Sequence, residues 1–207
     1  MISRILEDHF GLTQAPFPKT ASEAALLRHP ALEATLERLR FALHRETIAS
    51  LVAESGCGKS TVLALFAKRL DAARYHVLAT ALTTLSPFGL IAHLAALCGL
   101  RPARFKGTTA AARMAHLRSL PTRTLLLIDD AHRVPDASLE DLRLLTTDDV
   151  DRRSPFALVL VGQPLLRERL AEPQHYALAQ RLGVRLRLRP LNESEVLLFV
   201  ERHLTAA

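Results

Sequence analysis

The chain has 207 residues, of which 49% are hydrophobic, a size and composition that favour one large domain, or one domain with a small appendage. The 23% of charged residues argue against a largely disordered chain, and two cysteines outside any metal-ligand spacing exclude a disulfide framework and a zinc site. The net charge of +6 is typical of proteins with polyanionic partners, such as nucleic acid or an acidic membrane surface, and equally of a solvated basic surface.

The first residues, MISRILEDHF, contain no continuous apolar run with a small-residue cleavage site, and nowhere do about 18 uncharged apolar residues run together. We therefore expect no signal peptide and no membrane span within this chain. Cysteines outside a disulfide framework fit a reducing compartment, so the expected location is cytoplasmic.

Hydrophobic periodicity and turn residues predict helices and strands that alternate along the chain. In chain order we expect a helix at 30–45, a strand at 47–53, a helix at 59–70, a strand at 75–81, helices at 86–97 and 110–120, a strand at 124–128, a helix at 138–146, a strand at 156–161, a helix at 165–182 with a break near Pro173, a strand at 184–191 and a helix at 192–204. This order predicts an α/β fold of three layers, in which helices cover both faces of a parallel sheet of five strands.

The last expected strand, 184–191, alternates apolar residues with Arg185, Arg187 and Arg189. One interpretation is a DNA-binding ribbon. The alternation favours the other, an edge strand with one buried face and one solvated face, whose charges also block edge pairing between molecules.

A phosphate-binding loop follows the first expected strand. Residues 53–60 read A-E-S-G-C-G-K-S, which matches G-x-x-x-x-G-K-[ST] except that Ala53 replaces the first glycine. Alanine fits there unless the position needs a positive φ. Two glycines let the backbone amides turn inward, Lys59 neutralises the outer phosphates, and Ser60 holds Mg²⁺. The predicted ATP-binding residues are Glu54, Ser55, Gly56, Cys57, Gly58, Lys59, Ser60 and Thr61.

An apolar strand ending in two aspartates, LLLIDD at 125–130, is the expected partner of the loop. We predict that Asp129 acts on the Mg²⁺. Asp130 stands where hydrolysing enzymes usually carry a glutamate that orients the attacking water. Because aspartate is one methylene shorter, either the backbone is shifted or turnover is slow. We expect His132 to be a helix-capping residue, or one that lies behind the residues of the site, rather than a ligand.

With these residues in place, the chain resembles the AAA+ ATPases of the ExeA/GspA and TniB/TnsC group, which covers general-secretion ATPases and ATP-dependent regulators of bacterial transposition. The resemblance runs almost end to end. It is carried by HFGL with PF (9–12 and 16–17), ESGCGKST (54–61), TTLSPFGL (83–90), IDDAH (128–132), LRLLTTDDVDRRSP (142–155), LVLVGQP (158–164) and QRL (180–182).

This resemblance implies roles that spacing alone does not provide. Gln163, at the end of the fourth strand, would sense the γ-phosphate. Arg181 would be an arginine finger that acts on a neighbour's nucleotide, which requires a homo-oligomer, either a ring or a helical filament. The alternative for Arg181 is an ordinary surface arginine at the end of a helix.

The resemblance also implies a division of the chain. We expect a segment and helix packing on the core at 1–45, the AAA+ P-loop core at 46–191, and the start of a helical lid subdomain at 192–207. Only the first lid helix is present, and the family's lid arginine has no position here. The chain is therefore either a piece of a longer protein or a natural short form.

Two function classes follow. In the first, the chain is an ATP-dependent DNA-binding regulator of transposition that oligomerises on duplex DNA and recruits a transposase, with Arg101, Arg104 and Lys106 on a basic loop contacting phosphates. The alternative is a secretion or envelope-assembly ATPase of the general secretion pathway protein A type. A small-molecule kinase or a transporter ATPase fits poorly, because the sequence has no LSGGQ-like signature.

Overall fold

The computed structural model describes residues 9–13, 17, 30–146 and 154–207. Residue 16, which belongs to the expected PF motif, and residues 147–153 of the motif at 142–155 lie outside the described residues. The chain divides into two compact units, Thr35–Leu188 on the one hand and Met1–Ala34 with Arg189–Ala207 on the other. The functional division that the resemblance implies, with boundaries after residues 45 and 191, stays a prediction.

The larger unit is built on a five-stranded parallel sheet with the strand order β2-β3-β4-β1-β5. Every residue of β1 and β4 is buried, as the uninterrupted apolar runs predict. The strands are β1 (Ile48–Val52), β2 (Tyr75–Thr80), β3 (Arg123–Ile128), β4 (Phe156–Gly162) and β5 (Leu182–Arg187).

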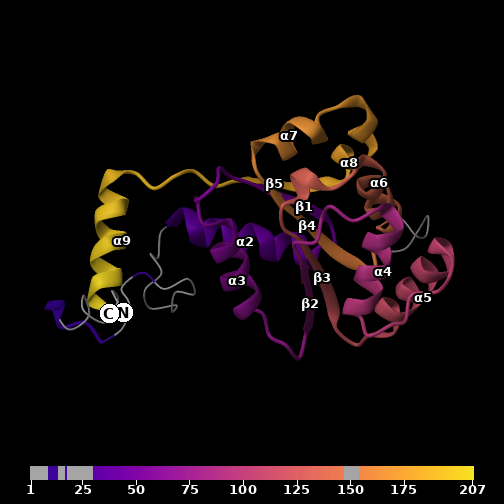
Figure 1. Cartoon of the computed structure of the whole chain (residues 1–207), viewed down its shortest axis with the longest axis horizontal. Coiled ribbons are helices and arrows are strands. Elements are labelled where there is room, and N and C mark those ends of the chain that lie inside the picture. The colour runs from indigo at the N-terminus through magenta and orange to yellow at the C-terminus, as the bar shows by residue number, and fades with distance from the viewer. Residues whose placement is uncertain (1–8, 14–16, 18–29, 147–153) are drawn as a thin grey trace. The chain divides into compact units, whose positions relative to one another are not determined.

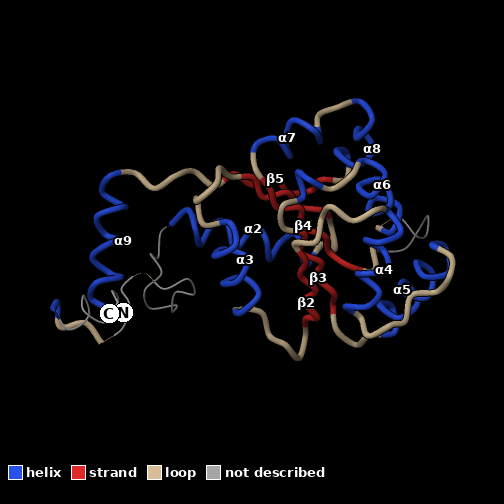
Figure 2. Tube along the Cα trace, viewed as in Figure 1, coloured by secondary structure: helices blue, strands red, loops and turns tan. Residues whose placement is uncertain are grey.

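Helices lie on both sides of this sheet, which confirms the expected three-layer α/β fold (Figures 1 and 2). Helices α2 and α3 lie on one side, and α4, α5 and α6 lie on the other (Figure 1). The helices of the larger unit are α2 (Pro30–His44, whose first residues belong to the smaller unit), α3 (Lys59–Lys68), α4 (Pro87–Leu97), α5 (Lys106–Ser119), α6 (Asp136–Leu145), α7 (Pro164–Leu170) and α8 (Tyr176–Gln180), with 3₁₀ turns η1 (Ala131–Arg133) and η2 (Pro173–His175).

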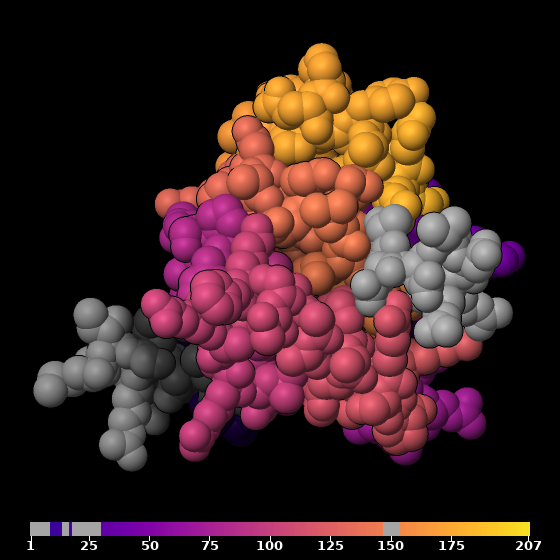
Figure 3. Space-filling view, turned by 90° about the vertical axis from the view of Figure 1, so that its right-hand side faces the viewer, coloured from indigo at the N-terminus to yellow at the C-terminus, as the bar shows by residue number. Residues whose placement is uncertain are grey.

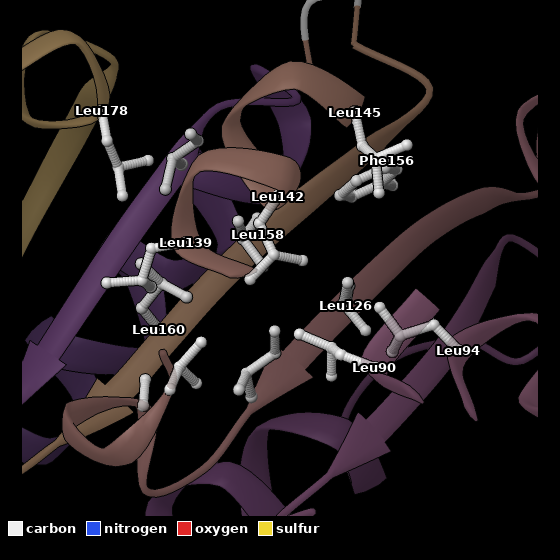
Figure 4. Close-up of a cluster of buried hydrophobic side chains, with 14 of the residues drawn as sticks. Leu90, Leu94, Leu126, Leu139, Leu142, Leu145, Phe156, Leu158, Leu160 and Leu178 are labelled. Atoms are coloured by element: carbon white, nitrogen blue, oxygen red, sulfur yellow. The ribbon is translucent and has the colours of Figure 1, made fainter. Parts of the chain in front are cut away.

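The apolar core on the second side of the sheet fixes α6 against the central strands. Leu139 and Leu142 of α6 are fully buried and lie over Leu158 and Leu160 of β4 (Figure 4). Because β3 and β4 are held rigidly by this packing, the loops that follow them start from well-defined positions.

Some helix boundaries differ from the sequence-based expectation. Helix α5 begins at Lys106 rather than at 110, because the buried Thr109 hydroxyl donates to the carbonyl of Phe105 at 3.0 Å and accepts the amide of Ala103 at 2.9 Å, which closes the first turn early. The expected helix at 165–182 is divided into α7, η2 and α8, with the break at Pro173 as predicted.

Strand β5 begins and ends earlier than expected, because its pairing with β1 runs from Leu182 to Arg187. It lies at an edge of the sheet, and its residues alternate between buried and exposed. The edge-strand interpretation is therefore confirmed.

In the smaller unit, the expected last helix is confirmed as α9 (Glu193–Thr205). The Asn192 side chain accepts the Glu195 amide at 2.9 Å, and the Glu195 carboxylate accepts the Asn192 amide at 2.8 Å, a capping box that starts the helix. Arg189 also donates to Glu195 at 2.6 Å. Among the described residues, none of the helices is both long enough and apolar enough to cross a membrane.

Candidate nucleotide-binding site

The loop after β1 has the backbone that a phosphate-binding loop requires. Gly56 and Gly58 both have φ of 80°, in the left-handed region that side chains disfavour. No atom lies within 4 Å of a Cβ built at either position, so conformation rather than lack of space demands glycine. Ala53 is not among the described non-glycine residues with positive φ, which explains why alanine is tolerated there.

Lys59 is the first residue of α3, and its side chain folds back over the loop. Its Nζ donates to the carbonyl of Glu54 at 2.8 Å and to the carbonyl of Ala53 at 3.1 Å. The ammonium group therefore lies against the loop backbone, at the N-terminal end of a helix, where negatively charged groups are favoured.

Asp129 joins the end of β3 to the first turn of α3. Its Oδ2 accepts a hydrogen bond from the Ser60 hydroxyl at 3.0 Å, and its Oδ1 accepts the amide of Asp130 at 2.9 Å. Both carboxylate oxygens are thus held in place. A carboxylate beside a hydroxyl offers the hard oxygen ligands that Mg²⁺ prefers, so the two side chains fit the metal expected with a nucleotide.

A cavity of about 320 Å³ opens beside this pair, between α3 and the ends of β2 and β3. Its walls are mostly apolar, and Ser60 and Asp129 are among the residues that line it. Residues 54–59 of the phosphate loop do not line this cavity, which therefore extends from the predicted metal ligands along α3.

The strand order explains why the remaining site residues meet. The loop follows β1, Asp129 follows β3 and Gln163 follows β4, which pairs with both of those strands. Since all strands are parallel, these carboxyl ends lie at the same end of the sheet, where α/β folds usually bind their ligands.

Asp130 and Gln163 lie at these carboxyl ends, where Gln163 is exposed and Asp130 is partly exposed. Asp130 has φ of 50°, an unfavourable conformation for a residue with a side chain. Gln163 is the N-cap of α7, and its backbone N–H donates to His132 Nδ1 at 3.4 Å. The structure thus brings the two predicted residues to the same end of the sheet as the loop.

Arg181 lies at the opposite end of the sheet, where the parallel strands begin. It caps the C-terminus of α8 directly before β5, its side chain is exposed, and its carbonyl accepts the Thr47 hydroxyl at 3.4 Å just before β1. Because the phosphate loop follows the other end of β1, Arg181 is placed away from the loop of its own chain.

The three predicted DNA-contacting residues have different environments. Arg101 and Arg104 are exposed before α5, and Arg104 lies 5.7 Å from the ring centroid of Phe105. Lys106 is not on a loop, as we expected, but in α5, where its Nζ pairs with Asp141 of α6 at 2.5 Å. The pink surface that faces the viewer in Figure 3 belongs to α5 and the segment before it.

Sequence reasoning missed a polar cluster next to the site. Arg169 of α7 donates to the carbonyl of His132 at 2.7 Å and pairs with Asp136, which also contacts His175 Nε2 at 3.0 Å. The hydrogen bond from Arg169 is the main cause that lowers the pKa of Asp136, burial opposes it, and His175 lowers it further. No local sequence pattern predicts this cluster, because its members come from four separate segments.

The family model described as AAA domain matches residues 42–170. General secretion pathway protein A of Aeromonas hydrophila is 38% identical over 85 residues, which make up 41% of this chain and 16% of that protein.

Solved structures share the fold. The crystal structure of Cdc6p from Pyrobaculum aerophilum matches with a TM-score of 0.68 at 18% identity, covering 90% of this chain and 52% of that one. The ORC1 protein of Aeropyrum pernix, solved in complex with DNA, matches with a TM-score of 0.65 at 18% identity, covering 89% of this chain and 52% of that one. The chain thus spans about half the length of these structures.

Proposed function

Because this chain belongs to the family of AAA domains, we propose that it is an ATPase that binds ATP and Mg²⁺ around Lys59, Ser60 and Asp129. The observation that carries the proposal is the Ser60–Asp129 hydrogen bond of 3.0 Å beside a loop whose two glycines have left-handed backbones. A P-loop lysine, a hydroxyl and a strand-end carboxylate together constitute the chemistry of triphosphate binding.

Each residue would have a distinct task. The loop amides and Lys59 would hold the phosphates, and Ser60 with Asp129 would hold the metal, which when bound neutralises charge on the phosphates. Asp130 would orient the attacking water, and Gln163 would contact the terminal phosphate. Since Asp130 is shorter than the usual glutamate, we propose that turnover is slow.

Isothermal calorimetry with ATP and Mg²⁺ tests the binding step. We expect Lys59→Ala to weaken ATP binding by roughly tenfold to a hundredfold, since charge-assisted hydrogen bonds contribute about 1.5–3 kcal/mol. Lys68→Ala removes the same charge from the exposed last turn of the same helix and is the matched control. Folded wild-type protein that shows no saturable heat with ATP or ADP would refute the proposal.

For the role of this ATPase, we propose a DNA-binding regulator of transposition that oligomerises on duplex DNA and recruits a transposase. Support comes from the net charge of +6 and from exposed Arg101 and Arg104. The ion pair of Lys106 with Asp141 leaves these two arginines as the stronger candidates for phosphate contacts. Arg181 is exposed and lies at the end of the sheet away from its own phosphate loop. This position suits an arginine that reaches a neighbouring subunit.

A second candidate role is a secretion ATPase. It is favoured by the 38% identity with general secretion pathway protein A over 85 residues. That protein is much longer than the matched stretch, so its whole activity does not transfer to this chain by similarity alone.

Fluorescence polarisation with duplex DNA distinguishes the two roles. For the regulator, we expect DNA binding that a slowly hydrolysed ATP analogue strengthens and that added salt weakens steeply. Arg101→Ala with Arg104→Ala should reduce it, whereas Arg167→Ala, an exposed arginine on α7, should not. Equal and negligible DNA affinity with and without nucleotide would favour the secretion role.

A further inference from the structure

His132 occupies the space between the two residues that the proposed hydrolysis needs. Its Nδ1 accepts the backbone amide of Gln163 at 3.4 Å and lies 3.9 Å from Oδ1 of Asp130. The imidazole is 10% exposed, whereas the carboxylate of Asp130 is 46% exposed. The largely buried ring therefore lies beside a carboxylate that is open to solvent.

The Nδ1 atom has a single lone pair. To accept from the Gln163 amide, the ring must be neutral and carry its proton on Nε2. In that state Nδ1 cannot donate to Asp130, so the carboxylate keeps its own acceptor oxygens for a solvent molecule. The contact with Gln163 and a hydrogen bond to Asp130 thus exclude each other.

Two further features define the place of His132. A Cβ at Gly162 would lie 3.2 Å from both the amide nitrogen and Nδ1 of His132, so the glycine makes room for the histidine. Arg169 donates to the carbonyl of His132 at 2.7 Å and is itself paired with Asp136. The backbone of His132 is therefore held by Arg169, and its imidazole occupies space that a side chain at position 162 would fill.

We propose that His132 is a positioning residue, which places Gln163 and Asp130 for ATP hydrolysis without touching the nucleotide. This inference rests on the proposed ATPase function. It assigns to His132 the task of holding the start of α7 against the end of β3, so that the two side chains at these strand ends keep a constant separation.

Turnover and binding together test the proposal. We expect His132→Ala to lower kcat by at least about tenfold, because misplacement of catalytic groups by about 1 Å costs up to about a hundredfold. The affinity for a slowly hydrolysed ATP analogue should change by less than about twofold, since the described hydrogen bonds and ion pairs of His132 go to Asp130, Gln163 and Arg169 and not to the phosphate loop. His132→Asn, which restores a short acceptor near the Nδ1 position, should recover part of kcat.

A second readout does not depend on turnover. Hydrogen exchange of the Gln163 amide, followed by NMR without nucleotide, should become about tenfold faster in His132→Ala, the loss expected for one hydrogen bond. Arg169→Met should lower kcat while keeping the imidazole. His76→Ala, at the other end of the sheet on β2, is the matched control and should leave both readouts unchanged.

The outcomes separate the two proposals. Wild-type protein that fails to bind or hydrolyse ATP refutes the ATPase function, and Gln163 exchange alone then decides whether His132 holds this amide. Active wild-type protein whose kcat is unchanged in a folded His132→Ala variant overturns the positioning role, whether or not the amide exchanges faster. Equal loss of kcat and of analogue affinity also overturns it, since that marks damage to the binding loop.

Discussion

The Ser60 hydroxyl donates a 3.0 Å hydrogen bond to Asp129 and so joins the first turn of α3 to the end of β3. The pair lies 69 residues apart in the chain. Since Asp129 also accepts the backbone amide of Asp130 through its other oxygen, hydrogen bonds hold both oxygens of the carboxylate. Preorganised ligands of this kind lower the cost of binding a metal.

This pair predicts the magnesium dependence of nucleotide affinity. In the wild-type protein, Mg²⁺ should strengthen ATP binding. In Asp129→Asn this gain should shrink by about tenfold or more, because a neutral amide loses the charge-assisted contact. Titration of a fluorescent ATP analogue with Mg²⁺ or with EDTA measures this gain, with Asp71→Asn, in the exposed loop between α3 and β2, as the control. An unchanged gain in Asp129→Asn would remove Asp129 from the site.

Gly183 predicts a steric effect on stability. A Cβ at this position of β5 would lie 2.6 Å from the Thr47 hydroxyl oxygen, too close for any real contact. We expect Gly183→Ala to lower the free energy of unfolding by about 1–3 kcal/mol, the usual cost of overpacking. Gly107→Ala in α5 meets no atom within 4 Å and should leave stability equal or raise it by up to about 1 kcal/mol. Urea unfolding measures both, and equal stability of the two variants would contradict the expectation.

The buried charge of Arg113 leads us to expect that an apolar residue at this position stabilises the fold. Its side chain is fully buried, and within the described parts of the chain none of its three guanidinium nitrogens has a hydrogen-bond partner. Burial lowers its pKa, an effect that nearby Cys98 opposes. The guanidinium lies 5.8 Å from the Phe156 ring centroid, a contact that contributes up to about 2 kcal/mol, less than the several kcal/mol that desolvating a charge costs.

Arg113→Met should therefore leave the free energy of unfolding equal or raise it by about 1–4 kcal/mol. Arg167→Met, on the exposed surface of α7, should change it by less than about 0.5 kcal/mol. Urea unfolding of the three proteins decides. A clear loss of stability in Arg113→Met would mean that the buried charge is favourable overall.

Asp136 predicts a pH dependence. Its pKa lies below the ordinary value of 3.8, chiefly because Arg169 donates a hydrogen bond to the carboxylate. A carboxyl group with a lowered folded-state pKa stabilises the fold above about pH 4, and this contribution is lost as the pH falls below that range. Because the side chain is 54% exposed, solvent screening limits the effect to about 1 kcal/mol at most.

The test compares the unfolding free energy of the wild type with that of Asp136→Asn at two pH values. Its unfolding free energy should be lower than that of the wild type at about pH 6, and the difference should shrink by about pH 3. Glu168→Gln, also on the surface, serves as the control for general charge effects. A difference that stays constant between the two pH values would show that the pair with Arg169 contributes nothing to stability.

Much of the fold follows from local patterns. The apolar runs at β3 and β4 and the alternation in β5 predict buried central strands and an edge strand, because burial on two faces or on one is written directly into side-chain polarity. The helix at Asn192 follows from a capping box within four residues. The predicted starts of α5 and β5 were wrong. Helix α5 begins early, at Lys106, because Thr109 closes its first turn, and β5 begins at Leu182 because pairing with β1 determines where it starts.

The sequence by itself determined the chemistry of the candidate site, because Gly56, Gly58 and Lys59 act through their own backbone and charge at fixed spacing. Only the tertiary structure decided which distant side chains meet. The strand order brings Asp129 to Ser60, and the packing of α6 and η1 brings Asp141 to Lys106 and His132 to Gln163. Such pairs depend on how elements pack in space, and no periodicity along a single chain encodes them.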